Sequence, residues 1–475
     1  MADIRDLRIA VIGAGMGGLG VALACAKKGF RHIDVFETAS DLGFVGAGIQ
    51  MPPNLVRVLS RLGCWDDIYA EATNVKGTSI REGSTNEELS HVAMPDIEEK
   101  YGFPHCTGHR ASLAGGLYKA CKQEAAIQFH FATVLVRYES FGPRPRFVVR
   151  PRDGSEADER VVEVDLVLAS DGIKSATRHQ ILAELGVEAQ EEDTGQAAYR
   201  IMLTRSEMEH DPEMLALLDS DEVVRWIGER RHIIAYPVSS KQIYNLSSTQ
   251  PDVNFAKATN ATYTTRGSKS AMLKVFEDFC PLVHRMLNLV PDGEVCEWKL
   301  RSHKPLPTWV HGSVVLLGDA CHPTLPHLSQ GAAMAIEDGA VLAEVVSRVA
   351  VDANTTVEDR AAAISRAFKV YERLRKPHCT ALVDLAFKSG RVLHLGEGKA
   401  REERDREFRL NGKTGSVPDK WASPDVQKMI YGHDCVKEAA DEYDRILAEI
   451  KKEEKVQGKT NGPTEPPSLA YSPAL

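Results

Sequence analysis

Three glycines near the start of the chain have the spacing of a turn that binds a pyrophosphate. Gly13, Gly15 and Gly18 follow a short apolar run and open a segment with helical spacing, and Glu37 ends the next apolar run. Gly13 permits a tight turn, Gly15 lets a pyrophosphate approach the backbone, and Gly18 allows close helix-to-strand packing. The helix N-terminus favours negative charge, and Glu37 can bind ribose hydroxyls. A purely structural glycine turn is the alternative, but the pattern favours a dinucleotide site, for FAD or NAD.

Two later segments each place an acid in a turn after a strand. Val167 to Arg178 reads VLASDGIKSATR and contains Asp171. Val314 to Asp338 reads VVLLGDACHPTLPHLSQGAAMAIED, with Asp319 in the turn and Gly331 opening a helix. The acid can hold ribityl or ribose hydroxyls, and the helix N-terminus can stabilise negative charge on a reduced flavin. Either segment alone is compatible with an ordinary strand-turn-helix, whereas both together, in this order, favour FAD.

Composition places the chain among ordinary globular proteins. The 475 residues carry a net charge of -9 without a basic block, which argues against nucleic acid as a partner. No apolar run has the length of a membrane span, and the N-terminus lacks the basic region of a signal peptide, so we expect a cytoplasmic enzyme. Nine scattered cysteines without metal-ligand spacing predict reduced thiols and no metal site.

The segments that must position these residues alternate between strands and helices. Residues 7–36 predict a βαβ unit, and the strands expected within 127–169 continue its sheet. Residues 196–250, rich in aromatic and β-branched residues, predict a second sheet. Residues 303–393 return to the first unit and continue in helices. The charged segment 396–409 is expected to be a solvated helix face rather than a partner surface.

These motifs together resemble those of the class A, single-component FAD-dependent aromatic monooxygenases, the group of 4-hydroxybenzoate and salicylate hydroxylases. GAGMGG with Glu37 matches their glycine motif, GHRASL with Arg110 their arginine motif, SDGIKSATR their DG motif, and GDACHPTLPHLSQG their GD motif. The likeness covers about residues 7 to 390. Finer segments are similar to the fungal branch around salicylate hydroxylase and 4-hydroxybenzoate 1-hydroxylase: Gly46 to Gln50 with Pro53 and Asn54, Ala198 to Arg200, Ala235 to Pro237, and Tyr431 to Asp434.

The resemblance implies an α/β fold in which a Rossmann-type FAD-binding domain is interleaved with a β-sheet substrate domain, with helices at the C-terminus. The substrate would lie between the two domains. The expected boundaries are 1–73, 108–184 and 300–380 for the FAD-binding domain, 74–107 and 185–299 for the substrate domain, 381–455 for the C-terminal helices, and 456–475 for a disordered tail.

The resemblance also implies which residues contact FAD. They are Gly13, Gly15, Gly18, Glu37, Gly48, Gln50, Arg110, Asp171, Asp319, Pro326, Gly331 and Ala332. Glu37 would bind the adenosine ribose, Arg110 the pyrophosphate, and Asp319 and Ala332 the ribityl and isoalloxazine parts, with Pro326 near the flavin edge. Because the chain has no second glycine motif of this kind, NADPH or NADH would dock transiently, with the DG segment helping.

Arg200 and Tyr236 are the predicted catalytic residues, again by resemblance. A fixed guanidinium lowers the pKa of a phenol and orients its oxyanion, and a tyrosine donates a further hydrogen bond. The alternative is a surface ion pair for Arg200 and a core aromatic for Tyr236.

Five further residues are candidates for a chemical role, on weaker grounds. We expect His322 and Cys321, in the GD turn, and His109 to be structural. His327 is ambiguous. Trp226 either lines the substrate pocket or packs in the second sheet.

The predicted activity is the NAD(P)H- and O2-dependent hydroxylation of a phenol or aromatic acid through a flavin C4a-hydroperoxide, with or without loss of a carboxylate. Substrates of the salicylate or 4-hydroxybenzoate type, prenylated ones included, fit this scheme. Two alternatives stay open: epoxidation or dearomatisation of a larger secondary metabolite, and a flavin-binding protein without turnover. We expect a monomer or homodimer whose partners are the small-molecule substrate and O2.

Overall fold

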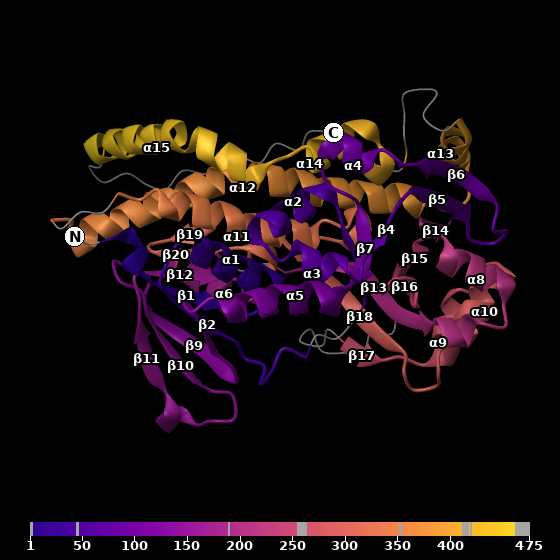
Figure 1. Ribbon diagram of the computed structural model, residues 1–475, viewed down its shortest axis with the longest axis horizontal. Helices are drawn as coiled ribbons and strands as arrows, with labels where there is room; N and C mark the ends of the chain where they lie inside the picture. Colours follow the sequence, from indigo (N-terminus) through magenta and orange to yellow (C-terminus); the bar gives the residue numbers. More distant parts are fainter. Residues whose placement is uncertain are drawn as a thin grey trace.

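The computed structural model describes residues 3–43, 47–188, 191–253, 264–350, 354–410, 418 and 420–460. It confirms a mixed α/β protein with an FAD-binding fold and C-terminal helices. Figure 1 shows an elongated molecule with one sheet left of its centre, a second sheet toward its right end, and long helices along the upper side.

The central sheet has six strands in the order β19-β20-β12-β1-β2-β8. Neighbouring strands are parallel except β19 and β20. Helix α1 packs against α5 and α11, and the strands β1 and β12 are almost wholly apolar, as expected for parallel strands covered on both faces. The bounds are β1 Arg8–Ile12, α1 Met16–Lys27, β2 His32–Phe36, α5 Arg110–Gln123, β8 Ile127–His130, β12 Leu166–Ala169, α6 Ala176–Glu184, β19 Val310–His311, β20 Val314–Leu316 and α11 Gly331–Ser347.

The prediction that residues 127–169 continue one sheet is wrong for their middle part. Strands β9 (Thr133–Ser140), β10 (Arg146–Pro151) and β11 (Arg160–Glu163) form a separate antiparallel sheet, which projects below the central sheet in Figure 1. Short turns join consecutive strands as hairpins, and a hairpin makes its strands antiparallel, whereas the central sheet is built from parallel crossovers. Only β8 and β12 join the central sheet.

The second sheet has eight strands in the order β17-β18-β13-β16-β15-β14-β5-β6. Short helices cover one face of it, and Trp226 is fully buried in that apolar layer, where its indole N–H donates to Asn86 Oδ1 at 2.8 Å. Trp226 therefore packs in the second sheet. The bounds are β5 Gly77–Glu82, β6 Glu88–Ala93, β13 Glu191–Thr204, α7 Arg205–Met208, α8 Pro212–Asp219, β14 Glu222–Gly228, β15 Arg231–Val238, β16 Ile243–Pro251, β17 Thr264–Arg266, α9 Lys269–Val275, α10 Pro281–Asn288 and β18 Cys296–His303.

A small three-stranded sheet has the order β3-β7-β4. It contacts the eight-stranded sheet, where β7 lies against β15 and β3 against β16. The remaining short elements are η1 Ile4–Asp6, β3 Gly48–Met51, α2 Pro53–Leu62, α3 Trp65–Tyr69, β4 Thr73–Asn74, α4 Ile97–Tyr101, β7 Cys106–His109, η2 Glu156–Asp158, η4 Gly318–Ala320, η5 Pro326–Leu328 and η6 Lys420–Ala422. Three of the predicted domain boundaries fall inside strands β4, β7 and β18, and the division into domains stays a prediction.

The C-terminal helices form the long upper layer of Figure 1. Helix α12 (Val357–Leu393) packs on α11 and on α15 (Cys435–Thr460), and α14 (Pro424–Tyr431) packs on α2. The guanidinium of Arg57 on α2 donates to the carbonyls of Tyr431 at 2.9 Å and His433 at 2.7 Å, so the segment that follows α14 is held against α2. Helix α15 continues to Thr460, and residues 461–475, the larger part of the predicted tail, lie outside the described part of the chain.

Helix α13 (Lys399–Leu410) corrects the expectation of a solvated charged face. Phe408 is buried in an apolar cluster with residues of the eight-stranded sheet. Arg404 is also buried and donates to the carbonyls of Val392 and Leu393, each at 3.1 Å. The charge run hid a buried face because its arginine stems and Phe408 recur at helical spacing. Among the described helices, none combines the length and the apolar character needed to cross a membrane.

Candidate functional site

Turns from distant parts of the chain meet at the carboxyl ends of β1, β12 and β20, the usual ligand edge of such a sheet. Gly13 has φ +93°, and a Cβ added there would lie 2.5 Å from the carbonyl oxygen of Ser170. A Cβ on Gly18 would lie 1.9 Å from the carbonyl oxygen of Gly13. Glycine is required at both positions, as the sequence predicted, because backbone occupies the space of a side chain.

The start of α1 has the form of a pyrophosphate cradle. Gly15 caps this twelve-residue helix, and no atom lies within 4 Å of the place where its Cβ would stand. Glu37, at the end of β2, accepts from the amide of Ala14 through Oε2 at 2.7 Å and from that of Ala39 through Oε1 at 2.8 Å. Open space before a helix N-terminus, with a carboxylate alongside, fits the diphosphate and ribose of a dinucleotide.

The two acidic turns stand at the same edge. Asp171 accepts from the amide of Thr177 at 2.9 Å through Oδ2, and its Oδ1 is buried without a partner among the described residues. The Asp319 side chain is exposed although its neighbours Gly318 and Ala320 are buried. Desolvation by the surrounding protein raises the pKa of the Asp319 carboxyl, while nearby positive groups, Arg110 among them, act in the opposite direction. Both acids have oxygen acceptors left for hydroxyl groups.

The start of α11 is held in place from the opposite side. Asn54 donates to Gln330 Oε1 at 3.1 Å and to Glu337 Oε1 at 2.8 Å. Gly331 and Ala332 are half-buried in the first turn of the helix, and Pro326 is exposed in the preceding η5. These positions leave helix N–H groups and the Pro326 ring accessible to a ligand.

One face of the eight-stranded sheet brings Tyr236 close to β3. Tyr236 pairs with Asn245 across β15 and β16. The amide of Gly48 donates to Asn245 Oδ1 at 2.6 Å, and a Cβ on Gly48 would lie 2.6 Å from Cε2 of Tyr236. The glycine at position 48 therefore permits close contact between the two parts of the chain. By contrast, Gln50 is buried and lies 3.3 Å from His105, so its predicted place along FAD stays a prediction.

Arg200 lies on the same face and near the other charged residues of the edge. It is half-buried, with its guanidinium 4.7 Å from the centre of the Trp298 ring. Burial lowers the pKa of Arg200 to about 10, with Arg110 acting in the same direction and Tyr236 in the opposite one. Burial raises the pKa of Tyr236, although Arg200 opposes this, so the phenol stays protonated and can donate. Among the described residues Arg200 forms no ion pair, which argues against the surface alternative.

His232 and Arg225 share this face and were missed from the sequence. Arg225 pairs with Ile234, and His232 is two residues before Ile234 on β15, so these side chains alternate onto the same face as Tyr236. His232 is buried with its Nδ1 2.6 Å from Nε2 of His394, and burial keeps both imidazoles neutral by lowering their pKa values, that of His394 to about 4. The alternation from Tyr236 back along the strand was the available signal.

The contacts of His322 in the GD turn indicate a structural role. His322 is buried, and its Nε2 lies 2.5 Å from Asp338 Oδ2, an acceptor that also binds the Gly318 amide at 3.0 Å. Desolvation acts to lower the pKa of His322, but the Asp338 carboxylate outweighs it and raises that pKa well above its usual value. Cys321 is buried, and burial raises its pKa to about 12, in line with a packing role. His109 caps α5 by accepting from the amide of Ala111 at 3.1 Å.

The cysteines and the possible metal ligands are considered apart from the FAD edge of the sheet. The nine cysteines are all free, in line with reduced thiols. Two groups of donor side chains lie close together, Cys321 with His322 and Asp338, and Glu337 with His378 and His433. The expected absence of a metal site therefore stays a prediction. His327 is buried without a partner for either ring nitrogen among the described residues.

The model of the FAD binding domain family matches residues 6–386. The chain belongs to this family. It is 30% identical over 442 residues to the FAD-dependent monooxygenase OpS4 of Beauveria bassiana, covering 92% of this chain and 97% of that one. It is 32% identical to 3-hydroxybenzoate 6-hydroxylase 1 of Aquipseudomonas alcaligenes, covering 72% and 80%.

Solved structures give the same fold. A salicylate hydroxylase in complex with substrate superimposes with a TM-score of 0.71 at 22% identity, covering 93% of this chain and 98% of that one. CtdE in complex with FAD and a substrate gives a TM-score of 0.75 at 19% identity, covering 94% and 100%. The family match and these relatives show that the protein is an FAD-dependent aromatic monooxygenase and that its cofactor is FAD. The resemblance noted from the motifs is confirmed.

Proposed function

We propose that this monooxygenase uses NADPH or NADH and O2 to hydroxylate a phenol or aromatic acid held as its phenolate by Arg200 and Tyr236. The observation that carries the proposal is the half-buried Arg200 guanidinium, without an ion-pair partner among the described residues, on the sheet face that also carries Tyr236. A buried cation without a counter-ion favours an anionic ligand.

In this proposal FAD lies along the carboxyl edge of the central sheet. Arg110 and Glu37 bind the diphosphate and the adenosine ribose, Asp171 and Asp319 bind hydroxyl groups, and the first turn of α11 faces the isoalloxazine ring. The remaining contacts are those of Gly13, Gly15, Gly18, Gly48, Gln50, Pro326, Gly331 and Ala332. When bound, the flavin takes hydride from the nicotinamide cofactor and supplies the oxygen atom that enters the substrate.

The side chains on the sheet face would prepare the substrate for attack. Arg200 lowers the pKa of the phenol and fixes the oxyanion, which raises electron density on the neighbouring ring carbon. Tyr236 stays protonated and donates a second hydrogen bond to that oxygen. The Trp298 ring beside Arg200 keeps water from the guanidinium on one side.

The named activities of relatives support an aromatic substrate. One is a 3-hydroxybenzoate 6-hydroxylase, and another, 32% identical over 369 residues, is a 6-hydroxynicotinate 3-monooxygenase. Each name describes a hydroxylated aromatic acid. The same site serves a reaction with or without loss of a carboxylate, depending on which carbon is attacked.

The test is NADH and NADPH oxidation by the FAD-loaded protein with salicylate, 4-hydroxybenzoate and prenylated 4-hydroxybenzoate, with products identified by mass spectrometry. We expect one of these phenolic acids to stimulate oxidation and to yield a hydroxylated product. If none does, but an extract of larger aromatic metabolites does, the epoxidase or dearomatising alternative holds. If no aromatic compound stimulates oxidation although FAD is bound, the protein binds flavin without turnover.

A further inference from the structure

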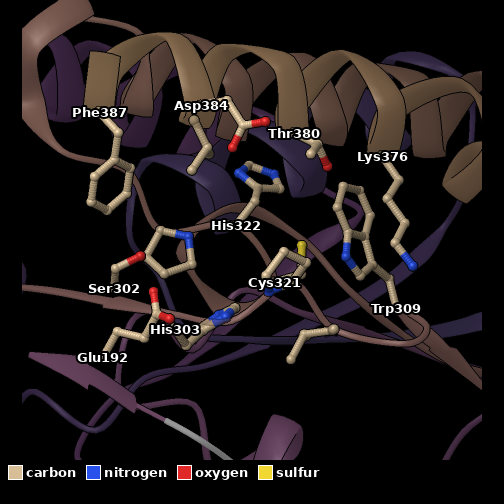
Figure 2. A pocket seen from close by; sticks show the side chains of 14 residues that line it. Glu192, Ser302, His303, Trp309, Cys321, His322, Lys376, Thr380, Asp384 and Phe387 are labelled. Atoms are coloured by element: carbon tan, nitrogen blue, oxygen red, sulfur yellow. The ribbon is translucent and has the colours of Figure 1, made fainter. Parts of the chain in front are cut away.

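A cavity of about 110 Å³ lies behind the GD turn, and none of the proposed FAD contacts lines it. It is bounded by the end of β18, by the turn after Gly318 and by one face of α12 (Figure 2). Trp309 and Phe387 form aromatic walls at its two ends, and Cys321 and His322 form the wall toward the GD turn. The volume is large enough for a single aromatic ring.

Two imidazoles in this cavity wall have ring nitrogens without partners. His322 Nδ1 and His303 Nε2 are buried, and neither has a hydrogen-bond partner among the described residues. His303 Nδ1 donates to the carbonyl of Lys304 at 2.8 Å, so its Nε2 is an acceptor. Burial lowers the pKa of His303 to about 4, which keeps it neutral. His322 pairs with Asp338 through Nε2 and is protonated, so its Nδ1 is a donor. The wall thus offers one donor and one acceptor that a ligand would satisfy.

The charges around the cavity select against an ionic ligand. Asp338 neutralises His322, and the Lys376 ammonium donates to the Pro307 carbonyl at 2.7 Å and lies 3.5 Å from Glu372. Glu192 and Asp384 also line the cavity, and the described residues hold no salt-bridge partner for either. An anion would meet these two carboxylates, and a cationic group that carries only N–H donors would leave the His322 Nδ1 donor without an acceptor. A neutral group that both accepts and donates is the best match.

We propose that this cavity is a second ligand site, separate from the flavin edge, and that it takes a planar monocyclic aromatic carboxamide. The amide carbonyl accepts from His322, the amide N–H2 donates to His303 or to the carboxylates, and the ring packs between Trp309 and Phe387. Because the His322 amide donates to the Gly318 carbonyl at 3.0 Å, the ligand contacts the turn that carries Asp319.

The test compares three ligands of nearly equal shape by isothermal titration calorimetry on the FAD-loaded protein: benzamide, the anion benzoate and the cation benzamidine. We expect saturable benzamide binding with one site, and binding of each ion that is at least about tenfold weaker, because benzoate meets two carboxylates and benzamidine has no acceptor for the N–H of His322. Benzoate or benzamidine binding as tightly as benzamide would overturn the proposed ligand class. No benzamide binding would overturn the site.

Three variants separate this cavity from the proposed phenol site. Thr380→Phe fills the cavity from α12, whereas Ala381→Phe places the same ring at an exposed position one residue later. Benzamide binding should fall at least tenfold in Thr380→Phe and stay unchanged in Ala381→Phe and in Arg200→Met. Loss in Arg200→Met alone would place benzamide at the phenol site and refute the proposal, whatever the outcome for hydroxylation.

A second measurement covers the case in which Thr380→Phe does not fold. Crystals of the FAD-loaded wild-type protein are soaked with 4-bromobenzamide, and the anomalous signal of bromine locates the ligand. Bromine between Trp309 and Phe387 supports the site. Bromine only at the sheet face beside Arg200, or no bound bromine, refutes it.

Discussion

Replacing Arg200 by Met removes the cation that the proposed function assigns to phenolate binding, while keeping much of the side-chain volume. Arg200 is half-buried and lies 4.7 Å from the Trp298 ring centre, so the variant keeps an apolar contact there but loses a charge-assisted hydrogen bond. Such a bond contributes about 2–3 kcal/mol, which corresponds to a loss of roughly 30- to 150-fold in kcat/KM.

The pH dependence makes this prediction specific to a phenolate. Without Arg200 the phenol ionises near its solution pKa, so the deficit of Arg200→Met should shrink as the pH rises toward that value. The assay measures substrate-dependent NAD(P)H oxidation and the amount of product. It covers roughly pH 6 to pH 9, the range below the pKa of a free phenol, which is about 10. Arg200→Lys should fall in between, because a lysine keeps the charge but not the planar fork.

A matched control is Arg205→Met. Arg205 follows the same strand but forms a surface ion pair with Asp219, so its loss should leave kcat/KM unchanged. The reasoning is refuted if FAD-loaded Arg200→Met keeps kcat/KM within about twofold of wild type, or if its deficit is the same at every pH, since a purely structural role would not depend on substrate ionisation.

Three further predictions concern FAD binding, pH and stability. Gly18→Ala should purify with little FAD, measured by the absorbance ratio of flavin to protein, because the new Cβ meets a carbonyl oxygen at 1.9 Å. His322 has a raised pKa in the folded state, so its stabilising effect is present below about pH 6.5 and is lost as the pH rises through the folded pKa; the Tm difference between wild type and His322→Gln should shrink with rising pH. Arg375→Ala should lower the free energy of unfolding by about 3–5 kcal/mol, because Arg375 is buried and pairs with Asp338 at 2.8 Å.

Each of these variants has an outcome that contradicts the structure. Gly20→Ala meets its nearest atom only at 3.4 Å and should keep FAD; equal FAD loss in both glycine variants would mean general damage to α1. A Tm difference for His322→Gln that grows with pH would contradict a protonated His322. Arg373→Ala, which removes an exposed ion pair with Glu453, is the control for Arg375, and equal effects would contradict the buried network.

The motifs of the central sheet could be predicted because their residues act through the backbone. Gly13 and Gly18 are required by contacts within one βαβ unit, and the run from His32 to Phe36 is a strand in the structure as in the sequence. These features depend on short stretches whose spacing is fixed by the geometry of a strand and a helix. Local sequence patterns therefore predicted most of the turns and strands that form the FAD edge of the central sheet.

The face of the eight-stranded sheet that carries Arg200 and Tyr236 could be predicted only in part. Arg200 and Tyr236 came from a family resemblance. Alternation along β15 could have indicated that His232 shares the face of Tyr236, whereas Arg225 joins that face only through the pairing of β14 with β15. His232 contacts His394, which is 162 residues away in the chain. Contacts of this kind depend on which strands become neighbours, and that order is set by the tertiary fold.

The sheet from β9 to β11 shows the same limit. The alternation of residues within Thr133–Ser140 indicated a strand but not which sheet it would join, since hairpin strands and crossover strands have similar composition. The turn at Gly142 and Pro143 separates β9 and β10 and could have indicated a hairpin.

The most direct test of the central claim is oxygen labelling with the FAD-loaded protein, NAD(P)H, a phenolic acid that stimulates oxidation, and ¹⁸O2. The proposed function predicts a product that contains one ¹⁸O atom, in a hydroxyl group on the aromatic ring. A product without ¹⁸O, or hydrogen peroxide as the sole fate of the oxygen with every phenolic acid, would contradict it.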